Sequence, residues 1–363
     1  MCVLLPESIA LHTIEYNLLF SQYCFRFTFL LRVLEYIIRG IRFVSIPFDS
    51  ICFVLYPVVC NARARGLGAE LGSVLLFATD SETHELAKEL GLTSFYNEKI
   101  FGEMPKGAAE EYGDNVFRKM MFAKVYCVHM VSMLGHDLLF QDVDVVWYKN
   151  PLDFFHNNNN NNHPTTTSLE TFDMIFQDDG NRGLYYSPYA ANTGFYYVKN
   201  NPQTKAFFNG LLLSGDMILS TYSHQIALIA LLSEHASLYG LRVKVWDRNT
   251  HEFPGGHFYH SKPDEMKKLA KGEISPYIFH MSWTNNKSDK VRYMQQMGQW
   301  YLKETCRNKS KADLVTGETS TIINLGKKCC SVEPLIQCHY RDKPSIIPCP
   351  DAPFIDKGGK SFW

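Results

Sequence analysis

Residues 138–151 read LLFQDVDVVWYKNP, and this stretch decides the fold. A run of apolar residues leads into Asp142 and Asp144, continues as VVW and stops at Pro151. Side chains two positions apart in an extended segment point to the same side, so both carboxylates are expected at one spot where a parallel strand ends. In open α/β sheets, ligands bind just outside the carboxyl ends of the strands. Two convergent carboxylates there suit a divalent cation such as Mn²⁺ or Mg²⁺, which can hold a diphosphate.

Segments on both sides of this stretch alternate between strand and helix. The expected strands cover residues 41–46, 73–80, 138–147, 172–179, 194–200, 241–246 and 277–283. The expected helices cover residues 48–65, 81–91, 115–135, 202–213, 223–237 and 288–304. This alternation implies an α/β fold with a parallel sheet.

We expect three parts along the chain. Residues 41–305 would form one large α/β domain, which is a size that a single core can support. An N-terminal segment, residues 1–40, precedes it, and a cysteine-rich C-terminal extension, residues 306–363, follows it.

The composition is that of an ordinary globular protein. Of the 363 residues, 46% are hydrophobic and 20% charged, and the formal net charge is −1. A chain without a basic surplus lacks the electrostatic signature of a nucleic-acid-binding protein, so no nucleic-acid partner is expected. The aromatic content of 14% is compatible with a carbohydrate-facing cleft, although an aromatic core explains most of it.

The cysteines are unevenly placed. Five of the ten lie in the last sixty residues: Cys306, Cys329, Cys330, Cys338 and Cys349. No C-x-x-C pair occurs, which argues against a zinc ribbon. A disulfide-stapled tail in an oxidising compartment fits better, and unrelated reduced thiols are the alternative.

Two N-terminal stretches are apolar enough to raise the question of a membrane anchor. Charged residues interrupt 18–40, and proline and aspartate interrupt 43–60. A spanning helix needs about 20 predominantly apolar residues, so neither stretch qualifies cleanly. No standard signal peptide stands out either. Membrane association through the N-terminal segment therefore stays an open expectation.

The helix before the two aspartates carries a lysine on its apolar side. Four residues follow the spacing of a buried helix face: Phe117, Met121, Val128 and Val131. Lys124 falls on the same stripe. Its ammonium either snorkels to the rim or reaches the mouth of the sheet, where it meets a phosphate or a carboxylate. We favour the second reading because the helix leads directly to Asp142.

A second polar cluster follows the strand at 172–179. Asp178 and Asp179 end this apolar strand. Asn192, Thr193 and Gly194 are expected to form a small polar turn, where the glycine lets the backbone approach a ligand closely. The alternative, for one of the two aspartates, is a tight turn capped by Asp and Asn.

A third polar segment, HMSWTNNKSDK, begins at His280. A neutral imidazole at the end of a strand is a good further ligand for Mn²⁺, and Lys287 and Lys290 could balance a diphosphate. A packed core histidine beside Trp283 is the alternative. GGHFYH (255–260) is a glycine turn that shapes either an acceptor site or a structural hairpin.

Taken together, these segments resemble the nucleotide-diphospho-sugar transferases of glycosyltransferase family 77, which have the GT-A fold. The resemblance covers about residues 41–305 and is carried by NARARGLG (61–68), LLFATD (75–80), GHDLLFQDVDVVWYKNP (135–151), QDDG (177–180), NTGFYYVKN (192–200), FPGG (253–256) and HMSWTNNKSDKVRYMQQMGQWYL (280–302). It implies a Rossmann-like, mixed, mostly parallel sheet flanked by helices. The chain departs from the family at His224-Gln225, where many members carry Asp-Gln, and in the poorly matched IRFVSIPFDS (41–50).

The resemblance implies a metal-dependent, retaining transfer of a sugar from a nucleotide diphosphate, usually UDP. Asp144 would bind the metal directly, Asp142 would contact the ribose or the metal through water, and His280 would be the late metal ligand. Lys287 would bind the diphosphate, assisted by Lys124. Mn²⁺, or Mg²⁺, would be the cofactor and a UDP-sugar the donor.

The resemblance also implies a nucleotide end and a sugar end of the site. Asp80 ends the second strand, where such proteins build the nucleotide pocket. Asp178, Asp179 and Gln225 would line the donor-sugar region as the catalytic set. Three residues would complete donor binding: Asn192, Thr193 and Gly194. The acceptor would be a glycan or glycoprotein, and the location the Golgi lumen or another part of the secretory pathway.

Two other functions remain compatible with carboxylates at strand ends. A metal-dependent phosphohydrolase or nucleotidyltransferase would act without an acceptor sugar, but the sequence has no P-loop and no dense His/Asp two-metal pattern. A non-catalytic relative would bind nucleotide or glycan without turnover.

Overall fold

The computed structural model describes residues 43–46, 52–102, 104, 113–156, 169, 171–307, 325–341 and 345–354. The chain divides into two units, residues 1–41 and residues 42–363. The expected N-terminal segment and its membrane association lie outside the described residues. The expected boundary after residue 305 stays a prediction.

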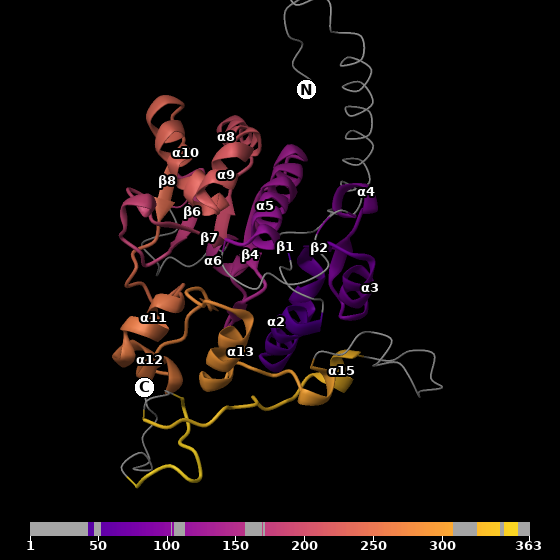
Figure 1. The fold of residues 1–363 in the computed structure, drawn as a ribbon, viewed down its shortest axis with the longest axis vertical. Helices are drawn as coiled ribbons and strands as arrows, with labels where there is room; N and C mark the ends of the chain where they lie inside the picture. Colours follow the sequence, from indigo (N-terminus) through magenta and orange to yellow (C-terminus); the bar gives the residue numbers. More distant parts are fainter. Residues whose placement is uncertain are drawn as a thin grey trace, which may run out of the picture. The chain divides into compact units, whose positions relative to one another are not determined.

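The second unit is built on a seven-stranded sheet of order β3-β2-β1-β4-β7-β6-β8 (Figure 1). Its strands are β1 (Phe43–Ile46), β2 (Val74–Phe77), β3 (Thr93–Phe95), β4 (Leu138–Asp142), β6 (Met174–Asp178), β7 (Ala191–Val198) and β8 (Val243–Val245). Strands β1 to β4 run parallel, β7 is antiparallel to both of its neighbours, and β8 is parallel to β6. This is the mixed, mostly parallel sheet that the sequence predicts, and the α/β class is confirmed.

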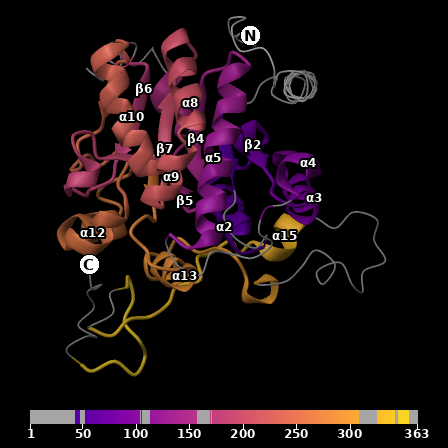
Figure 2. The same ribbon diagram turned by 45° about the horizontal axis from the view of Figure 1, so that its top comes forward.

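Helices cover the sheet. They are α2 (Cys52–Ala64), α3 (Ser81–Glu89), α4 (Glu98–Phe101), α5 (Asn115–Met133), α6 (Leu152–His156), α8 (Pro202–Leu213), α9 (Gly215–Thr221), α10 (His224–Leu238), α11 (Gly256–Ser261), α12 (Pro263–Ala270), α13 (Lys287–Gln296) and α15 (Leu325–Cys329). In Figure 2, α5, α8 and α10 form a layer over β4, β7 and β6. Strands β2, β4, β6 and β7 are buried almost throughout, as expected for strands covered by helices.

The sequence predicted a single strand over residues 138–147, and this prediction is wrong. β4 ends at Asp142, and after a turn β5 (Val145–Trp147) pairs antiparallel with β9 (Ile278–His280) in a separate two-stranded sheet. The amide of Met281 donates to the main-chain oxygen of Asp144 at 3.1 Å, which fixes this change of sheet. Asp142 therefore ends β4 and Asp144 lies in the turn before β5, so the two aspartates do not share one extended strand.

The predicted polar turn at 192–194 is also different. β7 begins at Ala191, so Asn192, Thr193 and Gly194 belong to the strand. The register of β6 against β7 shifts between Phe176 and Gln177, and the strand pairing resumes beyond this irregularity. Asn192 pairs with Gln177, whereas Thr193 and Gly194 lie in the irregularity itself, beside the carboxyl end of β6.

Two further segments differ near the end of the domain. Residues 256–261 form the helix α11, so the hairpin alternative is wrong. A Cβ atom at Gly256 would lie 1.8 Å from the main-chain oxygen of Ser282, which shows how closely the two chains approach. The last helix, α13, stops at Gln296, because Gly298 follows with a positive φ of 67° and ends the helical path.

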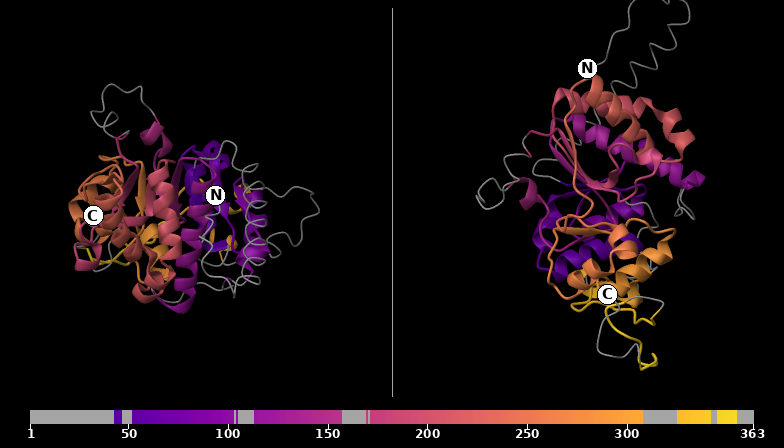
Figure 3. Two further views of the ribbon diagram at one scale, coloured as in Figure 1. Left: turned by 90° about the horizontal axis from the view of Figure 1, so that it is seen from above. Right: turned by 90° about the vertical axis from the view of Figure 1, so that its left-hand side faces the viewer.

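All five cysteines of the C-terminal extension are disulfide-bonded, as a stapled tail requires. Cys306 pairs with Cys329, and Cys338 pairs with Cys349. Cys330 pairs with Cys60 of α2, which ties the extension to the sheet domain. Figure 3 shows the orange and yellow C-terminal segments beside the indigo α2. In the described part of the chain, no helix has the length and apolar character that crossing a membrane requires.

Candidate functional site

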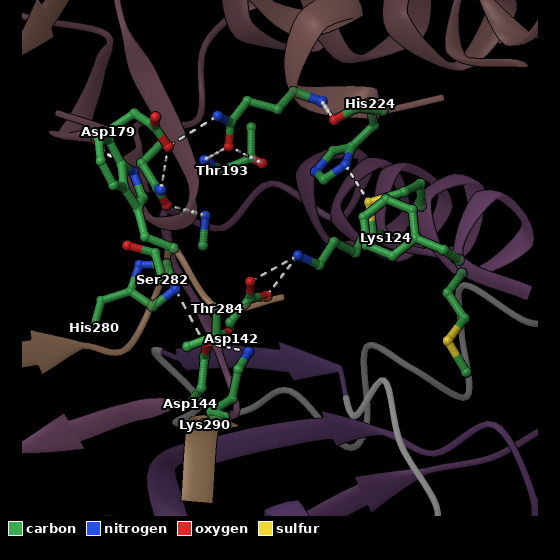
Figure 4. A pocket seen from close by; sticks show the side chains of 18 of the residues that line it. Lys124, Asp142, Asp144, Asp179, Thr193, His224, His280, Ser282, Thr284 and Lys290 are labelled. Atoms are coloured by element: carbon green, nitrogen blue, oxygen red, sulfur yellow. Dashed lines mark hydrogen bonds and ion pairs between the residues drawn. The ribbon is translucent and has the colours of Figure 1, made fainter. Parts of the chain in front are cut away.

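A pocket of about 420 Å³ opens where strands β4, β6 and β9 end (Figure 4). Polar residues from all three strand ends line it, namely Asp142, Asp179 and His280. The first residues of α10 and α13 form part of its wall. The pocket thus has the position that ligand sites take in open α/β sheets.

The three predicted metal ligands meet in this pocket. Asp142, Asp144 and His280 each present one ligand atom, and these atoms lie within 4.8 Å of one another. We call these residues the carboxylate–imidazole cluster. Asp144 and His280 are almost fully buried, with 4% and 3% of their surface exposed. The pairing of Val145 with His280 brings together residues that are far apart in the sequence.

Gln177 sets the orientation of the His280 ring. The side-chain amide of Gln177 donates to the main-chain oxygens of Phe253 and Pro254 at 2.9 and 3.2 Å, so its nitrogen and oxygen are assigned without ambiguity. Its oxygen must then accept from Nδ1–H of His280, 2.8 Å away. With the proton on Nδ1, Nε2 of the neutral ring carries the lone pair that a metal needs.

Space for this ring depends on Gly194. A Cβ atom there would lie 2.2 Å from Cε1 of His280 and 2.8 Å from Oδ2 of Asp142. Both distances are far below any van der Waals contact, so no other residue fits without displacing the cluster. The close backbone approach expected at Gly194 is therefore real, although it serves two protein side chains and occurs in a strand.

Two lysines neutralise the carboxylates. Nζ of Lys124 lies 2.6 and 2.9 Å from the oxygens of Asp142, and Nζ of Lys290 lies 2.6 Å from Oδ2 of Asp144. Burial lowers the pKa of Lys124, and Asp142 opposes that shift. Burial alone would raise the pKa of Asp144, but the ammonium group of Lys290 holds it well below its usual range. Asp144 is therefore ionised at neutral pH.

These residues fit a divalent cation. Oδ1 of Asp144 accepts no hydrogen bond from the residues that the structure describes, and it lies 3.3 Å from Nε2 of His280. When Nε2 is unprotonated, two acceptor atoms face each other, and a cation between them removes the conflict. Carboxylate oxygen with imidazole nitrogen is a donor set that suits Mn²⁺ and related cations.

A second group of polar residues lies beside the cluster and contains no positively charged side chain. Oδ1 of Asp179 accepts from Asn192 at 2.9 Å and from Nε2 of Gln225 at 3.0 Å. Oε1 of Gln225 accepts from both the amide and the hydroxyl of Thr193 at 3.0 Å. We call these four residues the amide network. It leaves Oδ2 of Asp179 without a hydrogen bond to any described residue, and hence open to a ligand.

Two helices begin at the pocket, and they differ in charge. The first turn of α13 carries Lys287 and Lys290, both of which line the pocket. The first turn of α10 carries His224 and Gln225, which line it as well. Burial lowers the pKa of His224 well below its ordinary value, so its imidazole is neutral at pH 7. A helix N-terminus attracts anions, and the lysines add to this effect only at α13.

Two predicted site residues do not line the pocket among the described residues. Asp80 caps α3, accepting from the amide and hydroxyl of Thr83 at 2.8 and 2.6 Å. Asp178 binds Arg182 through both oxygens, at 2.9 and 2.7 Å. Oδ1 of Asp178 also accepts from the amide of Gly180 at 2.7 Å, which is the capped-turn alternative for this residue. Their proposed roles in nucleotide and sugar binding stay predictions.

Sequence reasoning did not find every residue that shapes the site. Gln177 precedes the two aspartates in QDDG, but only its contacts with distant carbonyl groups reveal what it does. Lys124 was expected at a phosphate or a carboxylate, and the structure shows the carboxylate. Lys290 was expected near a diphosphate and is bound to Asp144.

Comparisons with known proteins bear on the family to which the chain belongs. The family model for nucleotide-diphospho-sugar transferases matches residues 69–294. A UDP-galactose:fucoside alpha-3-galactosyltransferase of Dictyostelium discoideum is 24% identical over 210 residues, which are 54% of this chain and 30% of that protein. The beta-arabinofuranosyltransferase RAY1 of Arabidopsis thaliana is 23% identical over 261 residues, which are 67% of this chain and 44% of that protein. The matched region thus spans less than half the length of either relative.

Among solved structures, a glycosyltransferase involved in the glycosylation of the major capsid of PBCV-1 aligns with 69% of this chain and 96% of its own. Its sequence identity is 14% and its TM-score 0.32. The family model covers more than half of the chain, which confirms the resemblance seen in the sequence. The chain belongs to the nucleotide-diphospho-sugar transferase family.

Proposed function

We propose that this protein transfers a sugar from a UDP-sugar to a hydroxyl group of a glycan or glycoprotein, with retention of the anomeric configuration. Mn²⁺ or Mg²⁺ would be required. The observation that carries the proposal is the carboxylate–imidazole cluster, in which Asp144 and His280 present two facing acceptor atoms.

Charge balance supports a diphosphate next to this cluster. Lys124 and Lys290 already neutralise Asp142 and Asp144. The positive charge of a divalent cation would therefore not be neutralised by the carboxylates. The two negative charges of the diphosphate in a UDP-sugar would balance it. Such a cation supplies Lewis-acid stabilisation of the charge that grows on the leaving diphosphate.

The two helix starts suggest how the donor lies. The diphosphate would sit at the first turn of α13, where Lys287 and Lys290 add to the helix dipole. The transferred sugar would sit at the amide network, where Oδ2 of Asp179 can accept from a sugar hydroxyl. A neutral hydrogen-bonding surface suits hydroxyl groups better than it suits phosphate.

The reaction breaks the bond between the anomeric carbon and the phosphate oxygen, and the electron pair leaves with UDP. A new bond forms between the anomeric carbon and the acceptor oxygen. The acceptor proton passes to the departing phosphate oxygen, so both events occur on one face of the sugar. This path needs no protein nucleophile, and Asp179 and Gln225 would hold the sugar in position.

Two alternatives fit less well. A two-metal phosphohydrolase needs a denser set of ligands than the single group of three that the described residues contain. A non-catalytic relative would bind nucleotide or glycan in the same pocket, and the absence of UDP release from any UDP-sugar would distinguish it. The disulfide-bonded tail supports a location in the secretory pathway, such as the Golgi lumen.

The direct test measures UDP release from a panel of UDP-sugars with and without Mn²⁺, for the wild type and for Asp144→Asn. We expect Mn²⁺-dependent release by the wild type and a loss of about 100-fold or more in the variant. Equal release by the variant, or release that EDTA does not reduce, would contradict the proposal.

A further inference from the structure

Trp283 has an unusual combination of backbone conformation and exposure. Its φ is +60°, in the left-handed region, where a bulky residue is an outlier. Its side chain is not part of the core, since 42% of the residue surface is exposed. It lines the pocket, directly after the strand that ends in His280.

Hydrogen bonds hold this residue at both ends. The indole N–H donates to the main-chain oxygen of Asp179 at 2.8 Å. The main-chain oxygen of Trp283 accepts from Nε2 of His260 at 2.9 Å. A left-handed conformation is unfavourable for a residue other than glycine and persists only where its surroundings determine it.

Neither the backbone nor the core explains a tryptophan here. Glycine or asparagine would adopt the same conformation at a lower cost. An indole buried in the core would contribute far more than one that is largely exposed. The rings of His257 and His260 lie beside the indole, with centroids 6.2 and 6.5 Å away, and hold it in place. The part that these contacts leave exposed presents a rigid aromatic surface to the pocket.

The contact with Asp179 places this surface at the sugar end of the pocket. The carboxylate of Asp179 belongs to the amide network, and the main chain of the same residue anchors the indole. Lys287 and Lys290 belong to the other end, at α13. A ligand on the indole would therefore lie beside the transferred sugar, and not beside the diphosphate.

We propose that Trp283 is the platform of the acceptor subsite and that the acceptor is a carbohydrate whose apolar ring face stacks on the indole. Pyranose and furanose rings present C–H groups on one face, and these pack well on the electron-rich face of an indole. Hydroxyl groups at the ring edge can reach polar neighbours such as Asn181, which lines the same pocket. The inference rests on the proposed function.

The test measures binding of a panel of methyl α- and β-glycosides (galactose, fucose, arabinose, xylose and glucose) by saturation-transfer NMR, in the presence of Mn²⁺ and UDP. The variants are Trp283→Asn, which tolerates the left-handed backbone, and Trp283→Phe, which keeps a smaller aromatic face. Tyr239→Asn is the matched control, because Tyr239 is exposed on α10 and does not line the pocket. UDP affinity is measured by calorimetry for each protein.

We expect Trp283→Asn to weaken glycoside binding about tenfold. Trp283→Phe should lose less glycoside affinity, and Tyr239→Asn should bind glycosides like the wild type. UDP affinity should stay within about twofold in all of them. Unchanged glycoside affinity in Trp283→Asn overturns the inference, and so does an equal loss of UDP affinity, which would place the uracil on the indole. A wild type that binds UDP but no glycoside overturns the inference alone, whereas one that binds neither overturns the proposed function too.

Discussion

The two halves of the pocket are organised by different forces. In the carboxylate–imidazole cluster, Asp142 and Asp144 are held by lysine ammonium groups, and one acceptor atom stays unmatched. In the amide network, neutral donors and acceptors satisfy one another, and Asp179 is the single charged member. The same sheet edge therefore carries a charged half and a largely neutral half.

The carboxylate–imidazole cluster needs a bound cation to satisfy its acceptor atoms, whereas the groups of the amide network already satisfy one another. Ion pairs exchange partners when a stronger charge arrives, so Lys290 can turn to a phosphate once a cation satisfies Asp144. Hydrogen bonds in the amide network need no such change, which keeps the sugar end in one geometry. Variants should accordingly affect metal affinity in the first half and turnover in the second.

Among residues that are not metal ligands themselves, Gly194→Ala is expected to have the largest effect on metal affinity. The new methyl group would overlap the ring of His280 and the carboxylate of Asp142, so the cluster must open. We expect the Mn²⁺ affinity measured by calorimetry to fall about 100-fold, which is the upper end for losing a residue that positions a metal ligand. Gly72→Ala is the matched control, because no atom lies within 4 Å of a Cβ placed there. Wild-type affinity in Gly194→Ala would show that the cluster is not the metal site.

Gln225→Glu tests the neutral half. A carboxylate in place of the amide would face Oδ1 of Asp179 and break the hydrogen bond between them. We expect turnover to fall about tenfold or more while Mn²⁺ affinity changes little, because the cluster is untouched. A parallel fall in Mn²⁺ affinity would mean that the two halves are not separable.

Gln177→Met removes the hydrogen bond that sets the His280 tautomer and keeps the volume of the side chain. Mn²⁺ affinity should drop about tenfold, which is the lower end for a residue that supports a ligand. Gln296→Met serves as the control, since Gln296 is equally buried and lies on α13 outside the pocket lining. The same loss in both variants would point to general destabilisation.

The smallest effect concerns acid stability without metal. Burial raises the pKa of Asp144, but the ammonium group of Lys290 lowers it by more, so it lies below the value of about 3.9 in an unfolded chain. The stabilisation is therefore present above about pH 4 and lost as the pH falls through the folded-state pKa. Urea unfolding in EDTA should show the wild type losing about 1 kcal/mol more than Asp144→Asn between pH 5 and pH 3. If the wild type and Asp144→Asn differed by the same free energy of unfolding at pH 5 and pH 3, the lowered pKa of Asp144 would be contradicted.

The sequence predicts the strand ends well, because an apolar run that stops at a polar residue is a local signal. The two aspartates and His280 were placed where strands end in this way. Asp142 and His280 are indeed the last residues of β4 and β9, although the expected strands, 138–147 and 277–283, ran past both. The break between β4 and β5 was missed, because it depends on pairing with β9, more than a hundred residues later. An extended chain through Asp144 is equally compatible with the local sequence.

The roles of small residues were harder to predict. Gly194 was expected in a turn, and its place in β7 depends on the shifted register with β6. Gln177 gives no local signal, since its function comes from carbonyl groups of the segment before α11. Helix α9 and helix α12 were not predicted, because both are short and follow directly on other helices.

The central claim is that Asp144 and His280 hold a divalent cation together. Calorimetric titration of Mn²⁺ into the metal-free wild type, His280→Asn and Asp144→Asn tests it directly. The account predicts one site in the wild type, with affinity that rises when UDP is present and falls about 100-fold or more in either variant. Equal binding by all three proteins, or no binding by the wild type with UDP, would contradict it.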